Sequence, residues 1–247
     1  MSKQLMIYAN AVPLSADDHR NLSVRQDGGY GFSSDLNSVP LVLAEFEKAA
    51  AEYPVVFAGD VTAGAWAITP AAIVGLRDGE NLFVDGNGAW SGRYIPAFLR
   101  RYPFVFAESP DQSSLTLCID TTYQGLDTTG KGERLFDTAG NRTQFLESTL
   151  RFTSDYQTQH AVTRAFIERL VDLDLLEPAT ANATLADGNQ LTLGGFSRVS
   201  TEKLAQLPDA TALDMFRNGM LALIQIHLQS MHQMPALLAR AESRAAG

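Results

Sequence analysis

Cysteine is almost absent from this chain of 247 residues, in which Cys118 is the single example. One cysteine excludes a disulfide within the chain. Cys118 stands in the apolar run Leu115-Thr-Leu-Cys-Ile-Asp120, and free cysteines are among the most often buried residues, so we expect a small buried side chain. A reactive thiolate would need a cationic or histidine-bearing neighbourhood, which the adjacent sequence does not supply.

Long hydrophobic runs are also missing. No apolar stretch approaches the roughly 18 residues that a membrane-spanning helix needs. The segment that opens the chain, Met-Ser-Lys-Gln-Leu-Met-Ile-Tyr-Ala-Asn, has too short an apolar run for a signal peptide and lacks a cleavage site. We therefore expect a cytoplasmic protein without a membrane span.

Positive charge is in deficit. The chain has 19 Lys and Arg against 28 Asp and Glu, which gives a net charge of −9 and a pI near 4.9. Nucleic acids and anionic membranes both require a basic surface, so we expect neither as the main partner. Apolar residues make up 45% and charged residues 19%, a globular balance that excludes a disordered or fibrous chain.

The motifs of common catalytic and cofactor sites are absent too. There is no Walker A loop and no Gly-x-Ser-x-Gly elbow, and Gly86-Asn-Gly88 followed by Gly92 does not have the dinucleotide-binding spacing. His227 and His232 lie roughly 140° apart around a helix, so they do not face one metal ion. We therefore predict no catalytic residues, no cofactor and no metal site.

Short apolar runs and helical patterns alternate along the chain. Buried strands are predicted at residues 53–58, 66–74, 104–106 and 115–119. Helices are predicted from apolar spacing at residues 41–53, 94–102, 141–176 and 209–230. Ser38 and Pro40 suit the cap and the first turn of the helix at 41–53. Ala186-Asp-Gly188 predicts a hairpin turn.

These elements are mixed without regular β–α–β alternation, which favours an α+β fold over a doubly wound sheet. We expect a mostly antiparallel, β-rich N-terminal half packed against a helix-rich C-terminal half, in one domain spanning 1–247. The alternative is a subdivision into a β-rich half at 1–123 and a helix-rich half at 133–247. The loop-like segment 124–132 between them is either a lid or a linker.

Aromatic and cationic residues interleave between residues 75 and 106, the strongest indication of a binding surface in this chain. Guanidinium groups bind carboxylates and phosphates bidentately and stack on aromatic rings, so the pattern suits a peptide or an anionic ligand. The competing interpretation is that the aromatics are core and the arginines pair with the chain's many acids. The predicted ligand- or partner-binding groove is lined by Trp90, Arg93, Tyr94, Arg100 and Arg101.

Carboxylates offer a second, enzymatic hypothesis. A pair converging on a cleft, with His227 as a base, could perform acid–base chemistry on a peptide or small amide. Turn and surface roles suit Asp78 and Glu80 equally well, because Arg-Asp-Gly-Glu is typical of a turn. The carboxylates considered are Glu45, Asp78, Glu80 and Asp85.

A dense set of short motifs extends over nearly the whole chain. The motifs are Asn37-Ser-Val-Pro40 with Glu45-Phe46, Tyr53-Pro-Val-Val-Phe57, Gly75-Leu-Arg-Asp-Gly-Glu-Asn-Leu-Phe-Val84, Trp90-x-x-x-Tyr-Ile-Pro-Ala97, Arg100-Arg-Tyr-Pro-Phe104 and Gly219-Met-Leu-Ala-Leu-Ile-Gln-Ile-His227 with Ser230. Together they resemble the SapC family of bacterial proteins, named after a gene product linked to surface-layer function.

The resemblance carries over no catalytic residue, because the family has no established enzymatic activity. Its members are often encoded near TonB-dependent receptors, tryptophan-halogenase-like proteins and iron-dioxygenase-like proteins. The implied function is that of a non-catalytic accessory protein in a nutrient-uptake or peptide-modification system. It would engage a peptide or a protein partner, such as a halogenase-like or dioxygenase-like enzyme. The family name implies a further alternative, a surface-layer component that self-associates.

Overall fold

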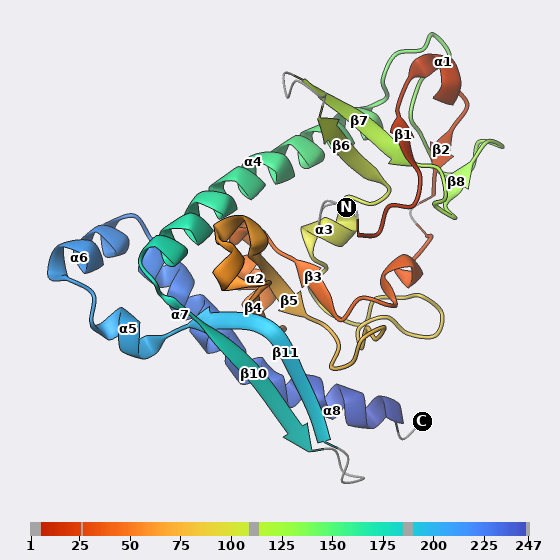
Figure 1. Cartoon of the computed structure of the whole chain (residues 1–247). Helices are drawn as coiled ribbons and strands as arrows, with labels where there is room; N and C mark the ends of the chain where they lie inside the picture. The colour runs from red at the N-terminus through yellow and green to blue at the C-terminus, as the bar shows by residue number, and fades with distance from the viewer. Residues whose placement is uncertain (1–5, 26, 109–113, 185–189, 246–247) are drawn as a thin grey trace.

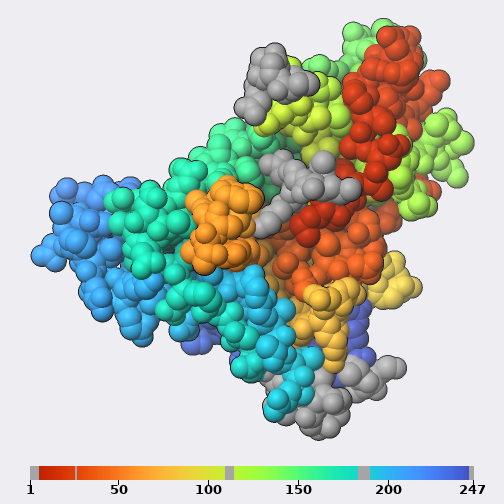
Figure 2. Space-filling model, in the orientation of Figure 1, coloured from red at the N-terminus to blue at the C-terminus, as the bar shows by residue number. Residues whose placement is uncertain are grey.

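The computed structural model of the chain describes residues 6–25, 27–108, 114–184 and 190–245. The fold is mixed α+β, with antiparallel sheets through the N-terminal and middle parts and helices concentrated in the C-terminal region. The predicted fold class is confirmed. In Figures 1 and 2, two small sheets lie at one end of the molecule, and helices α5 (Thr201–Ala205) and α6 (Asp209–Arg217) project at another.

A five-stranded antiparallel sheet forms the centre of the molecule. In spatial order its strands are β10 (Leu176–Thr184), β11 (Gln190–Val199), β4 (Val55–Ala58), β5 (Thr69–Ile73) and β3 (Ser38–Pro40). The middle strand β4 is fully buried at Val55, Val56 and Phe57, because β-branched and aromatic side chains pack well within a sheet. The predicted strands at 53–58 and 66–74 correspond to β4 and β5. The predicted turn at 186–188 lies outside the described residues.

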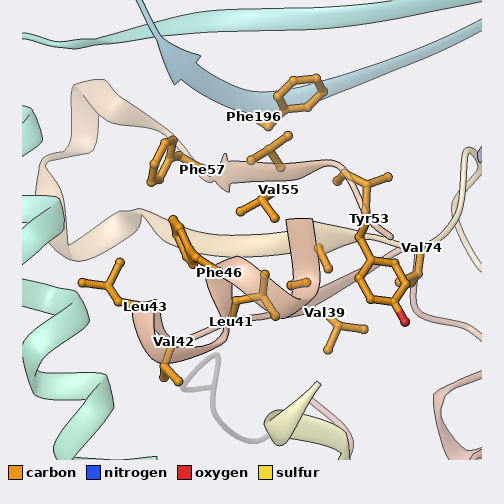
Figure 3. Close-up of a cluster of buried hydrophobic side chains, with 14 of the residues drawn as sticks. Val39, Leu41, Val42, Leu43, Phe46, Tyr53, Val55, Phe57, Val74 and Phe196 are labelled. Carbon is orange, nitrogen blue, oxygen red and sulfur yellow. The ribbon is translucent and has the colours of Figure 1, made fainter. Parts of the chain in front are cut away.

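Helices α2 (Phe46–Ala50) and α7 (Met220–Ser230) pack with this sheet and with each other. Figure 3 shows Phe46 of α2, Phe57 of β4 and Phe196 of β11 within one apolar cluster. The rings of Phe46 and Phe57 each lie 6.4 Å from the ring of Phe166. Burying each phenylalanine contributes about 1.5–3 kcal/mol, so this cluster is a main source of stability.

Two three-stranded sheets enclose a second, smaller core. One has the order β1 (Ala11–Pro13), β7 (Leu115–Asp120) and β6 (Phe104–Glu108), and the other has the order β8 (Leu126–Asp127), β2 (Ser23–Val24) and β9 (Glu133–Arg134). The predicted strands at 104–106 and 115–119 correspond to β6 and β7. Cys118 is buried in β7, as predicted, and burial raises the pKa of its thiol.

Helix α4 (Gln144–Asp172) connects the two cores. Its 29 residues span about 43 Å, and its N-cap is Thr143, whose hydroxyl accepts a hydrogen bond from the Leu146 amide. Leu146 lies in the smaller core and Phe166 in the larger one. Each core draws residues from both predicted halves of the chain. The single domain, and the alternative division at 124–132, stay predictions.

The remaining short elements complete the described chain. They are α1 (Ala16–His19), η2 (Gly31–Ser33), η3 (Leu43–Glu45), η4 (Val61–Ala63), η5 (Ala65–Ala67), α3 (Ala97–Arg100), η6 (Met231–Gln233) and α8 (Met234–Ala245).

Two helix predictions were partly wrong. The helix expected at 41–53 is reduced to η3 and α2, and Ser38–Pro40 pairs with β5 as strand β3 instead of capping a helix. The helix expected at 209–230 is two helices, α6 and α7. They separate at Gly219, whose φ of 82° lies in the left-handed region that glycine adopts at little cost.

Asp120, at the end of β7, ties the N-terminal segment to the small sheet. Its carboxylate accepts hydrogen bonds from the amides of Ala9 at 2.7 Å, Asn10 at 3.2 Å and Thr122 at 2.9 Å. Burial raises the pKa of Asp120, but these hydrogen bonds outweigh it and hold the pKa below its ordinary value.

Asp120→Ala is expected to lower the free energy of unfolding by about 2 kcal/mol at pH 7, because it removes the acceptor of three amides. Urea unfolding of the wild type and the variant measures the difference. Asp120→Asn retains one acceptor oxygen and should lose less. If the alanine variant unfolds at the wild-type midpoint, water replaces these bonds without cost and the prediction is wrong.

Candidate functional site

Arginine and aromatic side chains surround a cavity of about 480 Å³ between the small sheets and α4, which we call the aromatic–arginine cleft. Four separate parts of the chain form it: residues 24–32, residues 99–104, Tyr123 and the first turns of α4. Its arginines are Arg25, Arg100 and Arg101, and its aromatics are Tyr30, Phe32, Tyr102, Phe104, Tyr123, Phe145 and Phe152.

The short helix α3 positions the two neighbouring arginines. It begins after Pro96, whose carbonyl accepts hydrogen bonds from the amides of Leu99 and Arg100. Phe98 and Leu99 are buried, with exposed fractions of 1% each. Anchoring this apolar face leaves Arg100 exposed and turns Arg101 towards the interior. The predicted helix at 94–102 is thus reduced to four residues that fix the arginines.

Arg100 is held at the edge of the cleft by contacts that leave it exposed. Its Nε donates a hydrogen bond to the Ile95 carbonyl at 2.9 Å, and an Nη donates to the Tyr94 hydroxyl at 3.4 Å. Its guanidinium carbon lies 5.1 Å from the ring centre of Phe152 and 5.7 Å from that of Tyr94. Stacking on rings orients the guanidinium and leaves part of it available to a ligand.

Arg101 is the buried arginine of the cleft, with only 3% of its surface exposed. Its guanidinium carbon lies 4.6 Å from the ring centre of Tyr156, 4.8 Å from that of Phe98 and 5.7 Å from that of Tyr8. Burial raises the pKa of Tyr156 to about 12, although the charge of Arg101 opposes the shift. Arg101 is therefore a fixed cation set among neutral aromatic rings.

Tyr94 links the edge of the cleft to a buried carboxylate. Its hydroxyl donates a hydrogen bond to Glu45 Oε1 at 2.7 Å and accepts one from Arg100. Burial raises the pKa of Tyr94, and the neighbouring charge of Glu45 raises it further. The phenol therefore stays protonated and serves as a neutral bridge between Glu45 and Arg100.

Neither Trp90 nor Arg93 is among the residues that line the cleft. The Trp90 ring stacks on Phe83 at 5.7 Å and meets the ring of Tyr30, a lining residue, at 5.9 Å. Its Nε1 donates to the Tyr94 carbonyl at 3.2 Å. Arg93 is exposed, and its amide donates to the Glu52 carboxylate at 2.9 Å and 3.0 Å.

Of the five predicted site residues, Arg100 and Arg101 line the cleft, while Trp90 and Tyr94 touch residues that do. Arg93 is not among the lining residues. The lining residues that the sequence analysis missed lie far from 75–106 in the chain, and no local pattern connects them to it. They are Arg25, Tyr30, Phe32, Tyr123, Phe145 and Phe152.

The surface carboxylates considered for an enzyme serve local turns. Asp78 Oδ1 accepts a hydrogen bond from Asn37 Nδ2 at 3.0 Å, and Glu80 Oε2 accepts one from the Leu76 amide at 3.1 Å. Asp85 Oδ1 accepts two amide hydrogen bonds within its own turn, each at 2.8 Å. These are the bonds that stabilise short turns, in line with the turn roles weighed above.

His227, considered as a base, is fully buried between α7 and the central sheet. Its Nδ1 donates a hydrogen bond to the Val55 carbonyl at 2.8 Å, and its Nε2 accepts one from the Val199 amide at 3.1 Å. Both ring nitrogens are thus bonded to the backbone. Burial lowers the pKa of His227 to about 4, so the ring is neutral near pH 7.

Comparison with protein families finds that residues 14–237 match the SapC family. The chain belongs to the SapC family. The matched span includes every residue that lines the aromatic–arginine cleft, and it confirms the resemblance carried by the short motifs. Comparisons with curated proteins and with solved structures gave no match.

Two general properties accompany this SapC assignment. Within the described ranges, none of the helices has the length and hydropathy needed to cross a bilayer. Across the same residues, no group of three or more His, Cys, Asp or Glu side chains is placed to hold a metal ion.

Proposed function

We propose that this SapC protein is a non-catalytic accessory protein that binds a peptide or a protein partner through the aromatic–arginine cleft. The observation that carries the proposal is the convergence of three arginines and seven aromatic rings on one cavity. No aspartate or glutamate is among the described residues that line it. A local cationic cavity on a chain of net charge −9 is a feature that ligand recognition would account for.

The chemistry of the lining defines the segment that would bind. Arg100 offers guanidinium N–H groups to a carboxylate, which is the acceptor that arginine binds bidentately. Phe152 and Tyr30 offer ring faces and edges to an aromatic side chain. The cavity of about 480 Å³ is of the size that holds a small ligand or a few side chains. An acidic segment with an aromatic residue fits these properties.

The genes found near those of SapC proteins suggest which kind of partner this chain would bind. SapC proteins are often encoded beside TonB-dependent receptors and beside halogenase-like and dioxygenase-like proteins. A partner enzyme or its peptide substrate, in a nutrient-uptake or peptide-modification system of the bacterial cell, therefore comes first among the candidates. Such a system would use the chain as a binding subunit.

Arg100→Ala is expected to weaken partner binding by about tenfold or more, because it removes charge-assisted hydrogen bonds to a carboxylate. Tagged wild type and variant are used to capture the partner from the native cell extract, and mass spectrometry quantifies what each retains. The affinity of the retained partner is then measured by calorimetry with each form.

Arg93→Ala is the matched control, since Arg93 belongs to the same stretch but lies outside the cleft lining. It should retain the partner, and both variants should keep the wild-type melting temperature because both side chains are exposed. A partner that binds Arg100→Ala with wild-type affinity places the interaction elsewhere and contradicts the proposed cleft.

A further inference from the structure

A second cavity, of about 520 Å³, lies between α4, η5 and the ends of β3 and β5. None of its lining residues is shared with the aromatic–arginine cleft. Its volume lies in the range of small-molecule sites.

The floor of this second cavity is apolar and buried. Leu41, Ile68, Phe98 and Ile167 line it, and each is buried with an exposed fraction of 2% or less. These side chains come from four different elements or their flanks and belong to the larger core. The cavity is therefore shaped by packed core residues, which pre-form it for an apolar body.

Trp66 stands at this cavity with 74% of its surface exposed. It lies on the short helix η5, which Arg164 attaches to α4 by donating a hydrogen bond to the Ala65 carbonyl at 2.9 Å. An exposed tryptophan leaves a large apolar surface in water, and a flat ligand that covered it would gain that area on binding.

Two polar side chains of α4 face the same cavity. His160 and Arg164 are four residues apart, so they lie on one face of the helix. Neither ring nitrogen of His160 is hydrogen-bonded within the described part of the chain. Arg164 also contacts Glu168 at 3.7 Å, but no carboxylate is among the described lining residues. The polar side of the cavity therefore favours an anion.

Burial lowers the pKa of His160, and the charges of Arg164 and Arg101 lower it further, while Glu108 opposes them. The ring is therefore neutral near pH 7, with one N–H group and one lone pair. A neutral imidazole beside a guanidinium can donate to a carboxylate oxygen without bringing a second charge into the cavity.

We propose that this cavity binds a small organic acid with a flat apolar body. The body lies on the apolar floor against Trp66, and the carboxylate lies at His160 and Arg164. Shape and charge both define this class: the floor and Trp66 select the ring, and the guanidinium without a lining carboxylate selects the anion.

The probe is 2-naphthoate, with 2-naphthamide as its uncharged counterpart, and calorimetry measures binding to the full chain. The naphthoate should bind about tenfold more tightly than the amide, because its hydrogen bonds are charge-assisted. Trp66→Ala should weaken naphthoate binding about tenfold, because it removes the aromatic surface against which the naphthyl ring would pack. His160→Gln should weaken it about threefold to tenfold.

Phe216→Ala and Arg100→Ala serve as controls. Phe216 is 72% exposed, which matches Trp66, but it lies on α6 and does not line this cavity. Both variants should bind naphthoate like the wild type. Absence of naphthoate binding, equal binding by Trp66→Ala, or loss of binding in Arg100→Ala instead would each overturn the proposal.

An NMR pH titration of the histidine ring carbons tests where the carboxylate of the probe binds, because it measures the pKa of each ring. Naphthoate bound beside His160 should raise the pKa of that ring, because a nearby anion favours its protonated form, whereas the amide should not. Tight binding of both probes without a change at His160 would mean that the anion lies elsewhere, and it would overturn the assigned orientation. Displacement of bound naphthoate by a protein partner would show that a protein side chain occupies the cavity, and it would overturn the assignment to a small acid.

Discussion

Glu45→Ala is expected to lower the free energy of unfolding by about 3–5 kcal/mol. Glu45 is only 4% exposed, yet it is a carboxylate. Its Oε2 accepts a hydrogen bond from the Val42 amide at 3.0 Å. Its Oε1 accepts bonds from the Ala97 amide at 2.6 Å and the Tyr94 hydroxyl at 2.7 Å. Alanine would leave two buried amides and a hydroxyl without an acceptor and would open a cavity.

Chemical unfolding at pH 7 measures this loss, with Glu45→Gln as the matched control. Glutamine keeps the volume and one acceptor oxygen, so it should lose less than half as much as alanine. Glu45→Ala should also weaken partner binding, because Tyr94 and, through it, Arg100 lose their support. If glutamine and alanine destabilise equally, packing around the carboxyl matters less than its charge, and the argument from acceptor geometry is wrong.

Acid is expected to destabilise this protein through His227. Its pKa is about 4 in the folded chain against an ordinary value of 6.5, because burial disfavours the charged ring. Below pH 6.5 the unfolded chain binds a proton that the folded chain does not, so stability falls as the pH drops. The contribution of His227 to the free energy of unfolding is complete above pH 6.5. It decreases by about 2 kcal/mol by pH 5 and by about 3 kcal/mol by pH 4.

Urea unfolding of the wild type and His227→Gln, at pH 7 and at pH 5, tests this prediction. The Gln side chain does not titrate, so the variant should be less stable at pH 7 but should lose about 2 kcal/mol less than the wild type on going to pH 5. His160, whose pKa is also lowered, contributes in the same direction in both proteins. The same loss in both proteins would show that His227 is not the group responsible.

The candidate site was predictable only in part, because many of its lining residues lie far apart in the sequence. Arg100 and Arg101 were found because aromatics and arginines interleave within one short stretch. Arg25, Tyr123 and Phe152 were missed because the pairing of β2 with β8 and the docking of α4 bring them there. The core interpretation holds for Phe83, Phe98 and Phe104, which are buried, while the binding role of Arg100 at the cleft stays a proposal.

The fold followed the sequence where local pattern and burial agree. Apolar residues at helical spacing predicted α4 to within a few residues of its ends, and the apolar run at 55–57 predicted the central strand β4. Ser38–Pro40 was mistaken for a helix start because its strand character comes from pairing with β5, which no local pattern reveals. A continuous apolar pattern likewise concealed the break at Gly219.

The sequence by itself determined the acidic balance, the α+β class, the long helix and the SapC assignment, because composition, periodicity and short motifs are properties of neighbouring residues. The tertiary structure decided which side chains meet. It set Arg101 among Tyr8, Phe98 and Tyr156, and it brought His160 and Arg164 to the same cavity as Trp66. Those contacts depend on how α4 packs against segments that are distant in the chain. The spacing of neighbouring residues does not reveal such packing.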